Sequence, residues 1–106
     1  MIIEILKIAV NNPEGFTVSL PELQHITEGI IVSYQETQNS FGIDGLKVVF
    51  EHALAHDQVI GGWSFEGKYY FDSNKLFTDS EEAIEFGKSQ KQIAIFDLTE
   101  QRLIKL

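Results

Sequence analysis

The sequence predicts an α+β fold: an antiparallel or mixed sheet built from β-hairpins, with two or three packed helices in the order α-ββ-α-ββ-α-ββ. Three segments predict it. Residues 61–71 read as an aromatic hairpin, residues 78–83 as a capped helix start, and residues 92–98 as a buried strand. With 106 residues, 43% of them hydrophobic and 11% aromatic, the chain is expected to form one domain over residues 1–106.

The first half of the chain contains two predicted helices and two predicted strands. Apolar residues recur at helical spacing over residues 2–10, and the Asn-Asn-Pro that follows ends that helix. Alternation over residues 16–20 and β-branched residues over 29–34 predict two strands. The second helix is predicted over residues 44–57, with an apolar stripe made of Leu46, Val49, Phe50, Ala53 and Leu54.

The second half predicts a hairpin, a third helix and two further strands. Aromatic residues at 63–65 and 69–71 flank a short glycine-containing connection, which is typical of a β-hairpin. Thr78 and Glu81 have the spacing of a capping box, so Thr78 is the predicted N-cap. Residues 92–98 are apolar on both faces, which favours a central strand covered on both sides. Residues 103–106 are expected to close the sheet, with the main helices sharing one face.

Composition excludes several classes of function. The chain has no cysteine, which excludes disulfide scaffolds, thiol nucleophiles and thiolate metal sites. Sixteen acidic against eight basic residues give a formal charge of −8, so no basic face is available for direct nucleic-acid binding. The acidity indicates ordinary solubility, or a surface that imitates nucleic acid or docks on a basic protein. Without a signal peptide or a membrane span of ~20 apolar residues, the protein is expected to be cytoplasmic and to bind no membrane.

The sequence carries no strong catalytic motif. Its glycines match no phosphate-binding fingerprint, and no serine has the setting of a nucleophile elbow. His52 and His56 lie four residues apart on the predicted second helix and can face the same way. Two histidines can share a metal but do not complete a site, so solvated helix residues are the favoured interpretation. Asp72 and Asp97 have the most apolar surroundings, and capping or turning of strand ends is favoured over catalysis. No cofactor is implied.

Two groups of residues are candidates for binding. The polar loop at residues 35–42 concentrates amides and hydroxyls ahead of a helix start, where they either grip a ligand or cap the helix. Alternate aromatics of a hairpin face opposite sides, so some lie in the core while others are exposed and suited to a protein partner. The candidate binding residues are Thr37, Gln38, Asn39, Ser40, Trp63, Tyr69 and Tyr70.

Four segments carry a resemblance when they are taken together. They are residues 37–42 (Thr-Gln-Asn-Ser-Phe-Gly), 61–63 leading to 70–73 (Gly-Gly-Trp and Tyr-Phe-Asp-Ser), 81–83 (Glu-Glu-Ala) and 92–97 (Gln-Ile-Ala-Ile-Phe-Asp). In these segments the chain resembles small uncharacterised α+β proteins of bacteriophages and conjugative (mobile) elements, over most of residues 8–106. The resemblance implies no activity and no functional residue. It implies an accessory protein that binds host or element machinery.

The sequence therefore favours a non-catalytic protein-binding or accessory module, a monomer or homodimer, whose partner is a protein. One alternative is a small metal-dependent or hydrolytic enzyme that uses His52 and His56. Another is a homo-oligomeric structural protein paired through an edge strand at residues 103–106.

Overall fold

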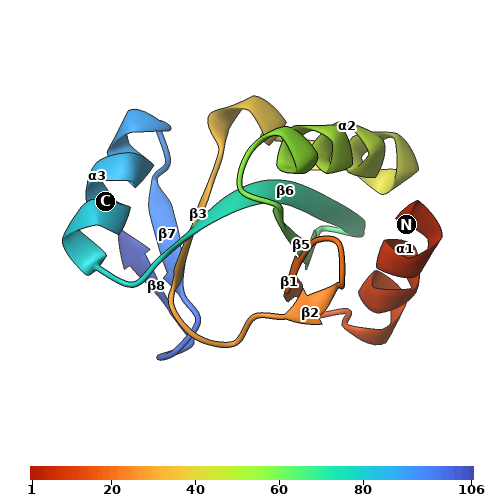
Figure 1. The fold of residues 1–106 in the computed structure, drawn as a ribbon, viewed down its shortest axis with the longest axis horizontal. Helices are drawn as coiled ribbons and strands as arrows, with labels where there is room; N and C mark the ends of the chain where they lie inside the picture. The colour runs from red at the N-terminus through yellow and green to blue at the C-terminus, as the bar shows by residue number, and fades with distance from the viewer.

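The computed structural model describes residues 1–106, which form three α-helices, one short 3₁₀-helix and one antiparallel sheet (Figure 1). The helices are α1 (Ile2–Asn11), η1 (Gln35–Thr37), α2 (Gly42–Ala55) and α3 (Ser80–Ser89). The eight strands are β1 (Phe16–Ser19), β2 (Gln24–His25), β3 (Ile30–Ser33), β4 (Ser40–Phe41), β5 (Val59–Phe65), β6 (Lys68–Phe77), β7 (Ala94–Asp97) and β8 (Arg102–Lys105). The α+β fold class is thus confirmed. No helix has the length and apolar character needed to cross a membrane.

The hairpin of β5 and β6 forms the middle of the sheet. Strands follow one another in the order β2-β1-β5-β6-β3-β7-β8, and β4 pairs with β6 alongside β3. The hairpin turn is Glu66-Gly67, and both residues have positive φ angles, 49° and 80°. A two-residue turn of this kind matches the twist of the two strands, so it fixes their register. The predicted hairpin is confirmed, and it extends further along both strands than the aromatic residues indicated.

All three helices pack on the same face of the sheet. The larger core cluster joins α1 and α2 to β1, β5 and β6, and its buried members are Ile5, Ala9, Phe16, Val18, Leu20, Leu46, Val49, Ala53, Ile60 and Phe71. The smaller cluster joins α3 to β3 and β7 through Ile30, Val32, Ala83 and Ile95. Val32 of the smaller cluster pairs with Lys75 of β6. Lys75 and Phe71 lie four residues apart on β6, and alternate residues of a strand point to the same face, so both clusters lie on one face of the sheet. In Figure 1, α3 lies to the left of the strands, α2 above them and α1 to their right.

The prediction of a central, doubly covered strand at residues 92–98 is wrong. β7 includes only residues 94–97 and lies next to the edge strand β8. Helix α3 covers one of its faces, and Ile93 just before it is 88% exposed. The apolar residues on the other face line a hollow instead of packing under a second layer of helices.

The predicted N-cap of the third helix is also wrong. The side chain of Asp79, not that of Thr78, accepts a hydrogen bond from the backbone N–H of Glu81 at 3.4 Å. Thr78 and Asp79 both have side-chain oxygens suited to an N-cap, and each is followed three residues later by a glutamate. The sequence pattern therefore does not distinguish the two residues.

The remaining differences concern short or marginal features. The predicted element order lacked β2 and β4, because two residues are too few to show an alternating pattern. Leu54 was expected in the apolar stripe of α2 but is 48% exposed. No side chain of the preceding polar loop caps α2, since its N-cap residue is Phe41 and makes no side-chain capping bond.

Candidate functional site

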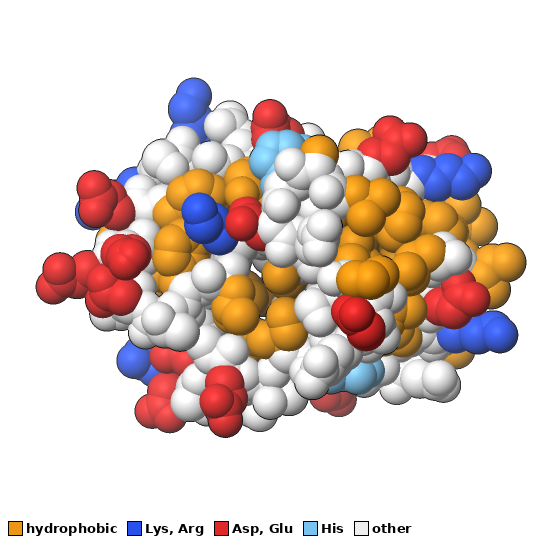
Figure 2. Space-filling model, viewed as in Figure 1, with side chains coloured by type: hydrophobic (Ala, Val, Ile, Leu, Met, Phe, Trp, Pro, Cys, Tyr) orange, Lys and Arg blue, Asp and Glu red, His pale blue; other side chains and the backbone are white.

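The face of the sheet opposite the helices forms a hollow of about 930 Å³. Strand pairing places Thr17, Gly61 and Asp72 side by side on this face, with Ser33 and Ile31 on the neighbouring strand β3. All five residues line the hollow. In Figure 2 the surface is hollowed near the centre of the view, with hydrophobic side chains around the opening. Ligand pockets have volumes of roughly 300–1,000 Å³, so the hollow has the size of a binding site.

The connection between β2 and β3 helps to enclose this hollow. The carbonyl of Gly29 accepts a hydrogen bond from the backbone N–H of Leu98 at 2.8 Å, and its N–H donates to the Thr99 hydroxyl at 2.8 Å. These bonds tie the connection to the end of β7. As a result, His25 from one end of the sheet and Phe96 from the other line the same hollow.

Asp72 is the only carboxylate that the sheet itself contributes to the lining of the hollow. It accepts a hydrogen bond from the Ser33 hydroxyl, which also lies 3.0 Å from Asn74 Oδ1. No positively charged side chain pairs with Asp72. Loss of hydration raises the pKa of Asp72, and the hydrogen bond from Ser33 and the nearby amide of Asn74 oppose this only in part. The expectation that Asp72 caps a strand end is wrong, because it lies within β6.

Beside Asp72, the side-chain amide nitrogen of Asn74 has no hydrogen-bond partner. Asn74 is fully buried. A Cβ on Gly61 would meet Asn74 Nδ2 at 2.5 Å and Asp72 Oδ1 at 2.6 Å, so only glycine leaves room for both polar side chains. The other predicted carboxylate behaves as expected: Asp97 accepts a hydrogen bond from the N–H of Glu100 and thereby stabilises a turn.

Four aromatic residues form a continuous strip beside the hollow. Trp63 stacks on Tyr70 with 5.0 Å between ring centroids, and Phe65 and Phe41 extend the row at 5.7 Å from Trp63 and Tyr70 respectively. Trp63, which is 44% exposed, also lines the hollow. We call Phe41, Tyr70, Trp63 and Phe65 the aromatic strip. It contains two predicted binding residues, Trp63 and Tyr70.

Tyr69, the third aromatic predicted to bind, lies on the opposite face. Its ring stacks on Phe16 at 6.3 Å, and its hydroxyl donates a hydrogen bond to the backbone oxygen of Asn12 at 2.7 Å. Burial raises the pKa of this phenol. Tyr69 therefore belongs to the packing of the core.

The four predicted loop residues do not form one surface. Thr37 is 1% exposed, and its hydroxyl accepts a hydrogen bond from Ser73 N–H at 3.1 Å, which fastens η1 to β6. Ser40 is half-buried in β4, while Gln38 and Asn39 are exposed. Sequence reasoning missed Phe41 as part of the aromatic strip, because its contact with Tyr70 depends on the pairing of β4 with β6.

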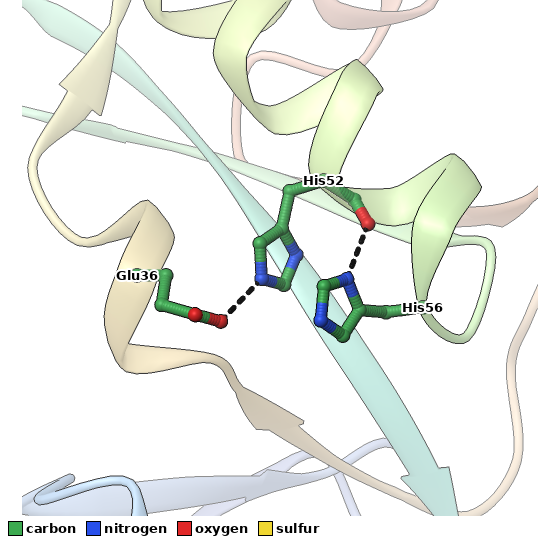
Figure 3. Close-up of side chains that lie close together, drawn as sticks. All are labelled: Glu36, His52 and His56. Atoms are coloured by element: carbon green, nitrogen blue, oxygen red, sulfur yellow. Dashed lines mark hydrogen bonds and ion pairs between the residues drawn. The ribbon is translucent and has the colours of Figure 1, made fainter.

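A second candidate site consists of Glu36, His52 and His56 (Figure 3). Glu36 comes from η1, and its Oε1 lies 2.6 Å from His52 Nε2. His52 lies in the last turn of α2 and His56 is the C-cap residue of that helix, and their rings stack 3.7 Å apart at an angle of 4°. The sequence indicated no third residue near the histidines, and the structure supplies Glu36. No local pattern marks it, because it lies 16 residues before His52.

The surroundings of this cluster hold the two imidazoles in place. His52 Nδ1 lies 2.8 Å from the Ser73 hydroxyl, and the Tyr34 ring lies 4.8 Å and 5.0 Å from the two imidazole rings. The hydrogen bond with His52 lowers the pKa of Glu36. Loss of hydration, and then the hydrogen bond that Tyr34 donates to Asp57, raise the pKa of Tyr34.

The two candidate sites differ in chemistry and lie on opposite faces of the sheet. The hollow offers apolar walls, an unpaired carboxylate and an aromatic edge, which suit the binding of a ligand with an apolar body and a cationic group. The cluster offers two imidazoles and a carboxylate, which suit a metal ion. No protein-family model, curated protein sequence or solved structure matches this chain.

Proposed function

We propose that the protein is a non-catalytic binding module whose hollow receives a segment of a partner protein, with a lysine or arginine side chain directed at Asp72. The observation that carries this proposal is the position of Asp72. It is a carboxylate without a cationic partner, in a hollow with largely apolar walls and an exposed tryptophan at its edge.

Electrostatics favours a basic occupant. A carboxylate removed from water is unfavourable unless a charge or hydrogen-bond donors compensate it, and a bound ammonium or guanidinium group provides both. The partner's cation would also favour the ionised form of Asp72, whose pKa is raised without it. The formal charge of −8 further attracts basic partners and speeds their association.

The aromatic strip supplies apolar contact area next to the charged anchor. Exposed tryptophan and tyrosine residues contribute a large share of the binding energy in many protein interfaces. Trp63 belongs to both the strip and the hollow, so one peptide segment can contact both. The resemblance to proteins of bacteriophages and conjugative elements supports a partner among host or element proteins.

Selection from a library of displayed random peptides tests this proposal. We expect the peptides enriched on the wild-type protein to contain a lysine or arginine flanked by apolar residues. Asp72→Asn and Trp63→Ala should each weaken their binding by roughly tenfold or more, about 1.4 kcal/mol for each factor of ten. Val48→Ala, a change at an exposed residue of α2 on the opposite face, is the matched control and should bind as wild type does.

Two results would contradict the proposal. One is enrichment of peptides without any basic residue, and the other is unchanged affinity of the Asp72→Asn variant. Replacing the basic residue of the best peptide with norleucine, which keeps an aliphatic chain but removes the charge, should reduce binding to wild type. The same replacement should have little further effect on binding to Asp72→Asn, because the two groups are expected to contact each other.

The alternative of a homo-oligomer has one supporting observation. β8 pairs only with β7 and is therefore an edge strand, with Leu103 62% exposed. Arg102 and Lys105 lie on the same strand, and charged residues on an edge oppose pairing with a second copy. The hollow is therefore the better supported site of interaction.

A further inference from the structure

We propose that Glu36, His52 and His56 bind one divalent transition-metal ion, with Zn²⁺ as the ion whose preferences they fit best. Each residue offers one ligand atom, and the three atoms all lie within 4.8 Å of one another. Two imidazole nitrogens and one carboxylate oxygen form a ligand set that Zn²⁺ commonly accepts. The site is independent of the proposed peptide-binding hollow, since it lies on the side of the sheet that carries the helices.

In both histidines Nδ1 makes a hydrogen bond that orients the ring and leaves Nε2 as the nitrogen that would bind the metal. His56 Nδ1 lies 2.7 Å from the backbone oxygen of His52, which can only accept a hydrogen bond. The neutral His56 ring therefore carries its proton on Nδ1 and its lone pair on Nε2. In His52 the Glu36 carboxylate can only accept, so the neutral ring carries its proton on Nε2, and its Nδ1 accepts a hydrogen bond from the Ser73 hydroxyl. An ion bound at Nε2 would displace that proton, and the ring would then carry its proton on Nδ1 and donate to Ser73 Oγ. Metal-binding histidines typically have such a partner on the second ring nitrogen.

Figure 3 shows the Nε2 atoms of both rings on the side that faces Glu36. His56 is the C-cap residue that follows α2, and the chain there turns its ring back against the ring of His52. Ser73 is fully buried, so the group that orients His52 is itself held firmly. The ring of Tyr34 packs against both imidazoles.

Binding an ion requires a rearrangement of the side chains in the cluster. Ligand atoms around a tetrahedral Zn²⁺ lie about 3.3 Å apart, given bonds of about 2.0–2.1 Å. A metal ion lies near the plane of each imidazole that binds it, so the two parallel rings must tilt relative to each other, while the Glu36 carboxylate moves away from His52 to admit the ion. The side chain of Glu36 is 65% exposed and free to turn, whereas that of His52 is 12% exposed. Three protein ligands leave the fourth position open to water.

Isothermal titration of the metal-free protein with ZnCl₂ tests the proposal. We expect one ion for each chain, and binding weakened by roughly tenfold or more in Glu36→Gln and in His56→Ala. Both substitutions are at exposed positions, so the variants should keep the fold, which circular dichroism would check. His25→Ala is the matched control, because this exposed histidine of β2 lies outside the cluster. Its affinity should equal that of wild type.

Nuclear magnetic resonance of the imidazole nitrogens gives a second readout. Zn²⁺ should shift the Nε2 signals of His52 and His56 and leave those of His25 unchanged. The proposal is wrong if millimolar Zn²⁺ produces no binding heat, or if Glu36→Gln and His56→Ala bind as tightly as wild type. It is equally wrong if His25→Ala weakens binding as much as they do, or if the signals of His25 shift with the others.

Discussion

The carboxylate of Asp72, which we propose as a binding contact, is also a residue whose surroundings reduce stability when it is ionised. Its hydrogen bond from Ser33 satisfies one oxygen, but the group lies among apolar walls without a cation. Loss of hydration dominates, and the pKa of Asp72 is raised above its ordinary value. The folded protein therefore holds the proton of Asp72 more tightly than the unfolded chain does.

This difference in pKa predicts a pH-dependent effect of Asp72→Asn. Below the unfolded pKa both states are protonated, so the stabilising effect of the raised pKa is fully present. As the pH rises from about 4 through the folded pKa, wild type loses that stability while the neutral asparagine variant does not. The free energy of unfolding, measured by urea denaturation at several pH values, should therefore rise for the variant relative to wild type. A difference that stays constant across this range would contradict the prediction.

At the scale of elements, sequence patterns over a few residues predicted the helices and the hairpin, which depend mainly on interactions between residues close together in the chain. The hairpin, α1, α2 and α3 all carry turn or periodicity signals within a few residues, and each of these elements is confirmed, although the N-cap of α3 is Asp79 instead of the predicted Thr78. The features that were missed depend on pairing between distant segments. β4 pairs with β6 some 30 residues away, and this pairing brings Phe41 to Tyr70. Glu36 reaches His52 in the same way, through tertiary packing that no spacing along the chain indicates.

The N-cap of α3 gives a test at this scale. Asp79→Ala removes the side-chain acceptor for Glu81 N–H and should lower the free energy of unfolding by about 1 kcal/mol. Thr78→Ala is the matched control, since Thr78 is exposed and makes no capping bond, and it should have a much smaller effect. Chemical denaturation of both variants distinguishes them. A larger loss for Thr78→Ala would mean that the capping box predicted from the sequence is the correct assignment.

For the whole molecule, one continuous sheet joins two clusters of buried side chains. β6 contributes Phe71 to the larger cluster and, further along, pairs with β3 of the smaller one. The sequence predicted the helices on one face from alternation in the strands. It did not predict the hollow on the other face, because apolar residues that line an open cavity look the same in sequence as residues that pack under a helix.

A shared sheet implies that the two clusters unfold together. Ile60→Ala, at a fully buried position of the larger cluster, should lower the free energy of unfolding by about 3 kcal/mol and leave a single transition. Calorimetry checks this, because the calorimetric and van't Hoff enthalpies should agree for the variant as for wild type. Two resolved transitions would show that α3 and the strands beneath it are a separate cooperative unit.

The place of Trp63 has a practical consequence. It is the single tryptophan of the chain, and it is partly exposed at the edge of the hollow. Indole emission depends on the polarity around the ring, and no other residue of this protein emits at the same wavelengths. The protein therefore contains its own optical reporter. An occupant of the hollow that displaces water from Trp63 should shift its fluorescence to shorter wavelength, so that partners can be screened without any attached label.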